Sequence, residues 1–431
     1  MSDVGKRSTL FETRFTFGAG MDLITKDQAR AGKIMQRVHP HGPAHSFNIL
    51  TTDPDDHNHN NHRRIYQVKV GDGSTAGLDA TDANMAYVAS IAAGTDLSIG
   101  EFLLDIGGSW TVVDASLYTP NMNSVTTGQD VTISYAVGDF IGPEYQESVQ
   151  IATGETMQTQ SISVAANFSA LRPRLSREIQ GIQGILGLGP SHIEQEAIFS
   201  DSAAEEEFGK LLISLTFSQN GLHGTLTFTK PDDSSYTGDL VYVPVTSVLP
   251  AADYWGIDLA VSYGGDIPLI PRGTGVIDPS TVLTLLGEQA YEQYKLRVGA
   301  TEDSETGLLV ITQVKHANLQ PLIFTIGDTA LELPVEAHIL PLAITERVGL
   351  HPGKIYLAIG SLGHSEGSGP DVIMGYTWLR WFCTVLTRRV RRVVEHSDTH
   401  AEKTVTTGKM FVDHIQIAIA RAAFAPAATN Q

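Results

Sequence analysis

Asp105 and Asp278 are the two residues of the sequence best suited to acid–base chemistry. Each follows a short apolar run and stands at a tight turn, in FLLDIGGSW and in GVIDPST. Two carboxylates that lie close together do not both ionise readily, so they share a proton. One of them then accepts a proton from water while the other protonates a carbonyl oxygen. An aspartate standing alone in such a place is usually a turn residue, so this chemistry requires both.

A weak internal repeat gives the two aspartates matching surroundings. Gly187, in IQGILGLG, lies 82 positions after Asp105, and Gly375, in DVIMGYTWL, lies 97 positions after Asp278. Each half therefore has an apolar strand, an aspartate at a turn and a later apolar-apolar-glycine segment. The repeat predicts two similar lobes that each contribute one aspartate where the lobes meet, with the two glycines as structural supports.

Short strands separated by turn residues must position these aspartates. From Met85 onward, runs such as QDVTISYAVGDF, LLISLTF, DLVYVPV and KIYLAIG alternate with Gly, Asn and Asp, which is typical of an all-β protein. Helical texture is confined to short pieces such as 283–296. The 431 residues are 42% hydrophobic and 18% charged, which supplies enough core for two or three domains or one bilobal domain.

Composition excludes several classes of function. The net charge of −19 argues against nucleic-acid binding, which needs a basic face to displace phosphate counterions. Cys383 is the single cysteine, so there is neither a disulfide framework nor a metal site built from several cysteines. The sequence contains no apolar run long enough to span a membrane and no visible secretory signal at its start.

Residues 1–82 are interpreted as a separate leader. Helical periodicity covers 21–38, with Ala31, Ile34, Met35 and Val38 on one face, and a capping box of Thr25 and Gln28 predicts that the helix begins there. Its basic residues are expected to oppose the acidic body at neutral pH and to lose this attraction as carboxylates are protonated. These residues are Lys26, Arg30, Lys33 and Arg37.

Three histidines in the leader, His57, His59 and His62, are candidate metal ligands. They stand in the polar, low-complexity run LTTDPDDHNHNNHRR. No apolar frame positions their imidazoles, so we interpret this run as a solvated linker and not as a metal site.

Several segments, taken in chain order, resemble those of the pepsin-like aspartic proteases, in particular the polyporopepsin-type fungal acid proteases. FLLDIGGSWTVVDA resembles the strand and Asp-Thr-Gly motif of the family, and SYAVGDFIGPEYQESVQI resembles its flap hairpin. IQGILGLGP, YWGIDLAVSYGG, HANLQPLIFTIGDTALELP and DVIMGYTWLRWF resemble further family segments, so the resemblance runs from about Tyr87 to Phe382. DQARAGKIMQRV is similar to part of a fungal prosegment.

The resemblance implies an all-β, bilobal pepsin-like acid protease fold with a central cleft and a partly helical prosegment before it. It implies a secreted-type endopeptidase, synthesised as a zymogen, in which Asp105 and Asp278 form the catalytic dyad and Tyr135 is the flap tyrosine. Gly107, Gly138, Asp139, Ser280 and Thr281 are the other substrate-binding positions that it implies. Its partners are polypeptide substrates and its own prosegment, without metal, organic cofactor, nucleic acid or membrane. The family pattern further implies a monomer in an extracellular or vacuolar location.

The chain is expected to divide into the leader at 1–82, an N-terminal β lobe at 83–260 and a C-terminal β lobe at 261–431. The last of these contains an extra basic segment near 387–410, which includes RRVRR and interrupts the family pattern. We interpret it as a surface loop, or as a segment foreign to the mature protein, in preference to a site for an acidic partner.

Both catalytic motifs depart from the family pattern. The family's Asp-Thr-Gly threonines bond across the lobe interface, but here Ile106 and Pro279 occupy these positions. Isoleucine has no hydroxyl and proline has neither a hydroxyl nor an N–H, so neither bond can form. Gly108 replaces the serine that supports the first aspartate, Ser280 replaces a glycine, and Val112 replaces a tryptophan, with Trp110 two residues earlier.

These departures keep a second interpretation open. The first is an aspartic endopeptidase that acts at acidic pH through the aspartate dyad and an activated water. The second is a catalytically impaired protein of the same fold that binds peptides or serves a structural role. A carbohydrate-binding β-sandwich is a third possibility, but it rests on the β texture alone and leaves the aspartate repeat unexplained.

Overall fold

The computed structural model describes residues 8–15, 23–35 and 85–423. Within the last range, the stretches outside the described residues are 94–97, 108–109, 123, 136–137, 153–154, 175–178, 191–209, 218–222, 228–230, 232 and 395–407. The linker histidines of the leader, Arg37 and Gly108 therefore lie outside the described residues.

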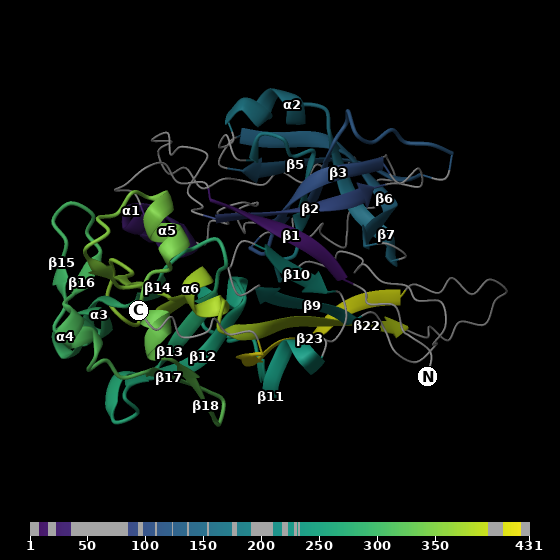
Figure 1. Cartoon of the computed structure of the whole chain (residues 1–431). Coiled ribbons are helices and arrows are strands. Elements are labelled where there is room, and N and C mark those ends of the chain that lie inside the picture. Colours follow the sequence, from purple (N-terminus) through teal and green to yellow (C-terminus); the bar gives the residue numbers. More distant parts are fainter. Residues whose placement is uncertain are drawn as a thin grey trace.

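A 13-stranded sheet forms the larger part of the molecule (Figure 1). Its order is β11-β23-β22-β9-β10-β1-β2-β3-β8-β4-β7-β6-β5. The strands are β1 (Ser8–Phe15), β2 (Met85–Ala93), β3 (Ser98–Asp105), β4 (Thr111–Asp114), β5 (Val125–Tyr135), β6 (Gly138–Ala152), β7 (Glu155–Ala165), β8 (Gly184–Gly187), β9 (Lys210–Phe217), β10 (His223–Thr227), β11 (Tyr236–Pro244), β22 (Phe382–Val394) and β23 (Gly408–Ala422). We call the part built on β2 to β8 the first lobe.

A seven-stranded sheet, in the order β18-β17-β12-β13-β21-β14-β20, forms what we call the second lobe. Its strands are β12 (Gly256–Tyr263), β13 (Ile267–Ile277), β14 (Thr284–Leu286), β17 (Leu322–Ile326), β18 (Thr329–Leu333), β20 (Ile359–Ser361) and β21 (Val372–Met374). A small sheet adds β15 (Thr301–Glu302), β16 (Leu309–Ile311) and β19 (Ile355–Tyr356). The predicted all-β, bilobal fold is thus confirmed, and β12 spans the predicted domain boundary at 260/261.

The internal repeat of the sequence corresponds to a repeated strand arrangement. In the first lobe β3 pairs in parallel with β8, which places Asp105 opposite Gly187, and β8 pairs antiparallel with β4. In the second lobe β13 pairs in parallel with β21, one residue before Asp278 and Gly375, and β21 pairs antiparallel with β14. A Cβ on Gly375 would lie 2.1 Å from the carbonyl oxygen of Leu283, so this close approach requires glycine.

The helices are short (Figure 1). They are α1 (Leu23–Met35), α2 (Phe168–Leu171), α3 (Glu288–Val298), α4 (Gln313–His316), α5 (Leu342–Arg347) and α6 (Tyr376–Leu379), with 3₁₀ turns at Arg172–Arg174, Asp233–Ser235, Ala251–Asp253 and Val335–His338. In the described part of the chain, no helix combines the length and apolar character needed to cross a membrane.

Two predicted helix boundaries are wrong. Helix α1 begins at Leu23, two residues before the expected cap at Thr25, because Leu23 is buried and starts the stripe that packs on the protein body. The predicted helix at 283–296 is divided between β14 and α3 at Gly287. Leu283, Leu285 and Leu286 are completely buried among β20 and β21, so sheet pairing decides their conformation.

The leader contributes to both lobes. Strand β1 lies between β10 and β2 in the large sheet, and its Phe11 is buried in the main apolar core. Helix α1 lies on the second lobe, where Asp27 bonds to the backbone of Leu283 and Gln28 to that of Ser361. The first described segments of the chain are therefore built into the folded body.

The C-terminal hairpin belongs to the large sheet. Strand β22 pairs with β9 up to Arg389 and with β23 up to Val394, and β23 also pairs with β11. The interpretation of 387–410 as a surface loop is therefore wrong for 387–394 and 408–410, where the extra residues prolong the strand pair. Residues 395–407 lie outside the described part.

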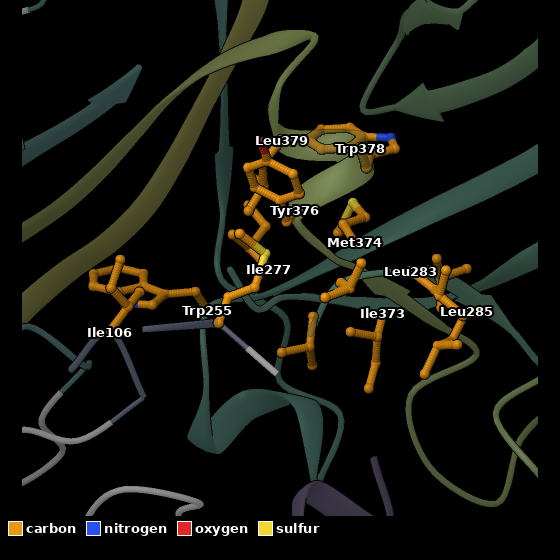
Figure 2. Packing of buried hydrophobic residues seen from close by; sticks show 14 of the residues in the cluster. Ile106, Trp255, Ile277, Leu283, Leu285, Ile373, Met374, Tyr376, Trp378 and Leu379 are labelled. Carbon is orange, nitrogen blue, oxygen red and sulfur yellow. The ribbon is translucent and has the colours of Figure 1, made fainter. Parts of the chain in front are cut away.

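One apolar cluster runs through both lobes and reaches the candidate site (Figure 2). Within this cluster Trp378 stacks on Phe382, with ring centroids 4.1 Å apart. Ile106 lies against Trp255 at one end of the cluster, in the first lobe's aspartate turn (Figure 2). The turns that carry the aspartates thus rest directly on the core.

Candidate active site

Asp105 ends strand β3 and is 1% exposed. Its backbone carbonyl accepts a 2.7 Å hydrogen bond from the N–H of Leu188, which follows β8. Its Oδ1 accepts a 3.1 Å bond from the backbone N–H of Gly107. The turn therefore supplies a backbone donor that supports the negative charge of this carboxylate.

Asp278 directly follows β13 and is 5% exposed. Its Oδ2 accepts a 2.5 Å bond from the hydroxyl of Thr281, and its Oδ1 accepts a 3.3 Å bond from the backbone N–H of Ser280. Its own N–H donates to the carbonyl of Met374, the last residue of β21. Ser280 and Thr281, predicted as substrate-binding positions, thus hold Asp278 in this structure.

Arg30 of helix α1 forms an ion pair with Asp278. Its Nε donates to Oδ2 at 2.5 Å and its Nη2 donates to Oδ1 at 2.7 Å, a two-point contact that fits a planar guanidinium. Arg30 is 1% exposed. Burial opposes its charge, but the attraction of Asp278, the hydrogen bonds and the charge of Asp105 prevail, so the pKa of Arg30 is raised. The guanidinium therefore lies in the electrostatic field of both aspartates.

Asp27 anchors the same helix to the second lobe. It is fully buried, and its two carboxylate oxygens accept bonds from the backbone N–H groups of Val282 at 3.1 Å and Leu283 at 2.8 Å. Gln28 donates from its amide to the carbonyl of Ser361 at 3.1 Å. Sequence reasoning identified Arg30 only as one of four basic residues and missed Asp27. An acid three positions before Arg30, on the same helix face, is the signal that was available.

The last turn of α1 carries a cation in an unfavourable environment. Burial, and then the positive charge of Arg30, lower the pKa of Lys33 from 10.5 to about 8. Arg30 and Ile34 line a small pocket together with Ile106, Gly107, Trp255 and Asp278. The helix therefore occupies the space directly beside both aspartate turns.

Three of the altered motif positions, Ile106, Pro279 and Val112, are apolar and buried. Ile106 is 6% exposed and lines that pocket with Trp255, and Pro279 is buried in the second turn. Val112, in β4, and Trp110 belong to a separate apolar cluster of the first lobe. Neither aspartate turn can therefore form the cross-lobe threonine bond, and packing occupies its place at Ile106.

The predicted flap is a hairpin of β5 and β6. Tyr135 is the last residue of β5 and pairs with Gly138, the first of β6, and Ser134 pairs with Asp139. Asn167, which sequence reasoning did not assign to the flap, lies outside this hairpin and bonds to its strand β6. Its amide donates to the carbonyl of Asp139 at 2.6 Å and its oxygen accepts from the N–H of Ile141 at 3.1 Å.

Hydrogen-bond donors surround the two aspartates. Within 8–15, 23–35 and 85–423 less the gaps given above, no cluster of three or more His, Cys, Asp or Glu side chains is arranged to hold a metal ion. The polar groups around the aspartates are backbone N–H groups, a threonine hydroxyl and a guanidinium. Such donors suit carboxylate acid–base chemistry.

Two β lobes that each present a buried aspartate beyond a parallel strand pair have the architecture of the bilobal acid proteases. The family description "Eukaryotic aspartyl protease" matches residues 106–394 of this chain. The chain belongs to this family.

Individual relatives agree with this assignment. The chain is 33% identical to polyporopepsin from Irpex lacteus over 325 residues, covering 72% of this chain and 93% of that protein. It is 26% identical to gastricsin from Cavia porcellus over 346 residues, covering 74% and 81%. The crystal structure of the aspartic proteinase from Irpex lacteus superposes with a TM-score of 0.60 at 30% identity, covering 80% of this chain and 96% of that one. The predicted resemblance to polyporopepsin-type proteases is confirmed.

Proposed function

We propose that this chain is the leader-bearing precursor of an endopeptidase that hydrolyses peptide bonds at acidic pH through Asp105 and Asp278. The observation that carries the proposal is the placement of both buried aspartates in the field of the Arg30 guanidinium. A buried cation aimed at a carboxylate pair is what a leader needs in order to neutralise the charge of a reactive site. Its relatives are named polyporopepsin and gastricsin, and the similar crystal structure is named as that of an aspartic proteinase.

In the proposed reaction the two carboxylates share one proton and hold a water molecule between them. The ionised carboxylate accepts a proton from this water as the water oxygen attacks the peptide carbonyl carbon. The protonated carboxylate donates its proton to the carbonyl oxygen, which gives a neutral tetrahedral diol. Proton transfer to the peptide nitrogen then allows the C–N bond to break. Thr281 and the N–H groups of Gly107 and Ser280 hold the carboxylates in orientation.

The substrate would lie in extended form beneath the β5–β6 hairpin, partly bound by backbone pairing as in strand addition. Tyr135, Gly138 and Asp139 are the positions proposed to meet it there, with Gly107 on the opposite side. Helix α1 must leave first, because Arg30 and Ile34 line the pocket beside Asp278. We extend the proposal to an extracellular or vacuolar location, where acidic conditions release the leader.

A specific observation favours the peptide-binding alternative. Ile106 and Pro279 remove both cross-lobe threonine bonds, and small displacements of a catalytic pair cost about a hundredfold in rate. A protein with this site could bind extended peptides and turn them over very slowly.

The deciding experiment is cleavage of a denatured protein by the acid-treated full chain at about pH 3–5. It is run with and without a statine-containing peptide, which mimics the tetrahedral intermediate. Asp105→Asn and Asp278→Asn serve as matched controls, because each keeps the size of the side chain and removes its charge. Cleavage that the peptide and both substitutions abolish supports the enzyme. Binding of the peptide without any cleavage supports the alternative.

A further inference from the structure

A side-chain bond crosses between the lobes at the second aspartate turn. The hydroxyl of Tyr87, in β2 of the first lobe, donates to the backbone carbonyl of Pro279 at 2.5 Å. Pro279 is the residue after Asp278 and stands where the family has a threonine. The bond therefore joins the first lobe to the residue whose own cross-lobe bond has been lost.

The ring of Tyr87 is buried and packed between aromatic side chains. Tyr87 is 2% exposed, and its ring meets Phe11 of β1 edge to face at 5.3 Å and Phe217 of β9 at 5.8 Å. Burial, followed by the electrostatic influence of Tyr376 and then the negative charge of Asp278, raises the pKa of Tyr87 well above its usual value. The hydroxyl consequently keeps its proton, and remains a donor to Pro279, at every pH at which the protein could work.

A second side chain connects the two aspartates through the backbone. The N–H of Leu188 donates to the carbonyl of Asp105 at 2.7 Å, and the indole N–H of Trp255 donates to the carbonyl of Leu188 at 3.3 Å. The carbonyl of Trp255 in turn accepts from the N–H of Ile277 at 3.0 Å, directly before Asp278. Trp255 directly precedes β12 of the second lobe and is 1% exposed, so this chain of bonds also crosses between the lobes in a buried environment.

We propose that Tyr87 and Trp255 are positioning residues that replace the missing cross-lobe threonine bonds and set the relative placement of Asp105 and Asp278. The proposal rests on the proposed function, since placement of the two carboxylates matters for their shared proton. Tyr87 fixes the second turn from the first lobe, and Trp255 fixes the backbone of both turns while it fills the space beside Ile106 (Figure 2). Both residues donate to backbone carbonyls of the turn segments, so they act on the aspartates through the turns.

The leader supports one of these residues. Phe11 closes one side of the Tyr87 ring, and Phe217, which also meets Tyr376 edge to face at 5.4 Å, closes another. If β1 leaves the sheet, Phe217 and Tyr376 remain as the aromatic support of Tyr87. The Tyr87–Pro279 bond is therefore expected to persist after the leader is removed.

The test compares Tyr87→Phe with Tyr294→Phe in the full chain after acid treatment. Both substitutions delete one buried hydroxyl, but that of Tyr294 bonds to His338 at 2.9 Å, within the second lobe. We expect Tyr87→Phe to lower kcat about tenfold to a hundredfold with KM nearly unchanged, and Tyr294→Phe to leave both within about twofold. Equal effects of the two substitutions on kcat would overturn the proposal, since a purely structural role predicts equal losses.

Trp255→Phe is compared in the same way with Trp378→Phe. Trp378 is fully buried, and its indole N–H has no hydrogen-bond partner within the described residues, so its replacement removes packing without removing a bond. We expect Trp255→Phe to lower kcat more than Trp378→Phe at equal folded fraction. The combined Tyr87→Phe and Trp255→Phe variant should lose more than either alone. A larger loss with Trp378→Phe would count against the role of Trp255.

A second measurement separates this proposal from the proposed function. The pH profile of statine-peptide binding reports the shared titration of the two carboxylates without any turnover. Tyr87→Phe is expected to shift the limbs of this profile by about half a pH unit or more, and Tyr294→Phe to leave them in place. If the wild-type chain binds the peptide without cleaving substrate, the proposed function fails and this shift still decides the positioning role. A wild-type chain that neither cleaves nor binds overturns both.

Discussion

Arg30 binds Asp278 through two hydrogen bonds of 2.5 and 2.7 Å, which connect the leader helix directly to one of the two paired aspartates. Both partners are buried, so the pair is shielded from water and salt. An arginine keeps its charge at every accessible pH, so acid can break the contact only by protonating the carboxylate. At this contact, acid therefore acts on the carboxylate of the body and not on the arginine of the helix.

Arg30→Gln should loosen the leader strongly. Removing one partner of a buried ion pair leaves the other uncompensated, at a cost of about 3–5 kcal/mol. We expect a fluorescent statine peptide to gain access to the site at least a hundredfold faster at about pH 6. Arg30→Lys keeps the charge but cannot make the two-point contact. Its rate of peptide access should therefore lie between those of the wild type and Arg30→Gln. Equal rates of access for wild type and Arg30→Gln would show that the pair does not hold the leader in place.

The strand framework was predictable because its signals are local. The aspartate repeat, the short β runs and the glycines that follow them reappear as the parallel pairs β3–β8 and β13–β21. The predicted element boundaries were wrong where contacts between segments distant in the sequence determine the local structure. Packing of Leu23 moved the start of α1, and sheet pairing at β14 removed part of a predicted helix.

The contacts around the aspartates were beyond prediction for the same reason. Asp27 meets backbone N–H groups 255 and 256 positions away, and Tyr87 meets Pro279 across 192 positions. Neither of these contacts produces a periodic pattern of residues in the sequence. The altered motif showed which bonds are missing, but only the fold shows which side chains stand near enough to replace them.

Lys33→Met should hold the leader more tightly. The pKa of Lys33 is about 8 in the docked helix, against 10.5 for the free side chain, so docking strengthens as pH rises from about 8 to 10.5. Below about pH 8 the lysine is charged in both states, and docking carries the full cost of its burial beside Arg30. Methionine removes this cost without changing the length of the side chain much.

We therefore expect acid-induced access of the statine peptide to slow by about tenfold in Lys33→Met. This magnitude already allows for the partial exposure of Lys33, which weakens its electrostatic interactions. Lys26→Met, which makes the same change of charge one helix position before Asp27, is the matched control. The explanation is wrong if both substitutions alter the rate equally, because the effect would then come from net charge alone.

His338 should make the second lobe sensitive to acid. It is completely buried beside Tyr294, and burial lowers the pKa of His338 from 6.5 to about 3. The unfolded chain takes up a proton as pH falls below about 6.5 while the folded chain does not, so stability is complete above this pH and declines towards pH 3. At pH 4 the loss from this group is about 3 kcal/mol.

His338→Gln keeps a polar partner for Tyr294 and removes the titration. Its free energy of unfolding should therefore fall by about 3 kcal/mol less than that of the parent chain between pH 7 and pH 4. Denaturant unfolding in an Asp105→Asn background, which prevents self-cleavage, provides the measurement. An identical pH dependence in both proteins would mean that other groups control acid stability.

Restoring the family motif tests how far the altered turns limit activity. Ile106→Thr and Pro279→Thr return the cross-lobe donors and acceptors, and Gly108→Ser and Ser280→Gly return the neighbours of the two aspartates. Two neutral hydrogen bonds contribute about 1–3 kcal/mol in total, and about 1.4 kcal/mol corresponds to a tenfold change in rate. We therefore expect weak acid proteolysis by the unaltered chain and at least a tenfold increase in kcat/KM when all four substitutions are made together.

The gain should be partial, because Pro279 already accepts the Tyr87 bond through its carbonyl and Ile106 already packs near Trp255. Adding Asp105→Asn to the restored protein must abolish the increase, which distinguishes dyad chemistry from a contaminating protease. A restored variant that folds, releases its leader and still fails to cleave would leave peptide binding as the function of this site. An unaltered chain that already cleaves as fast as the restored one would show that the account of the missing threonine bonds is wrong.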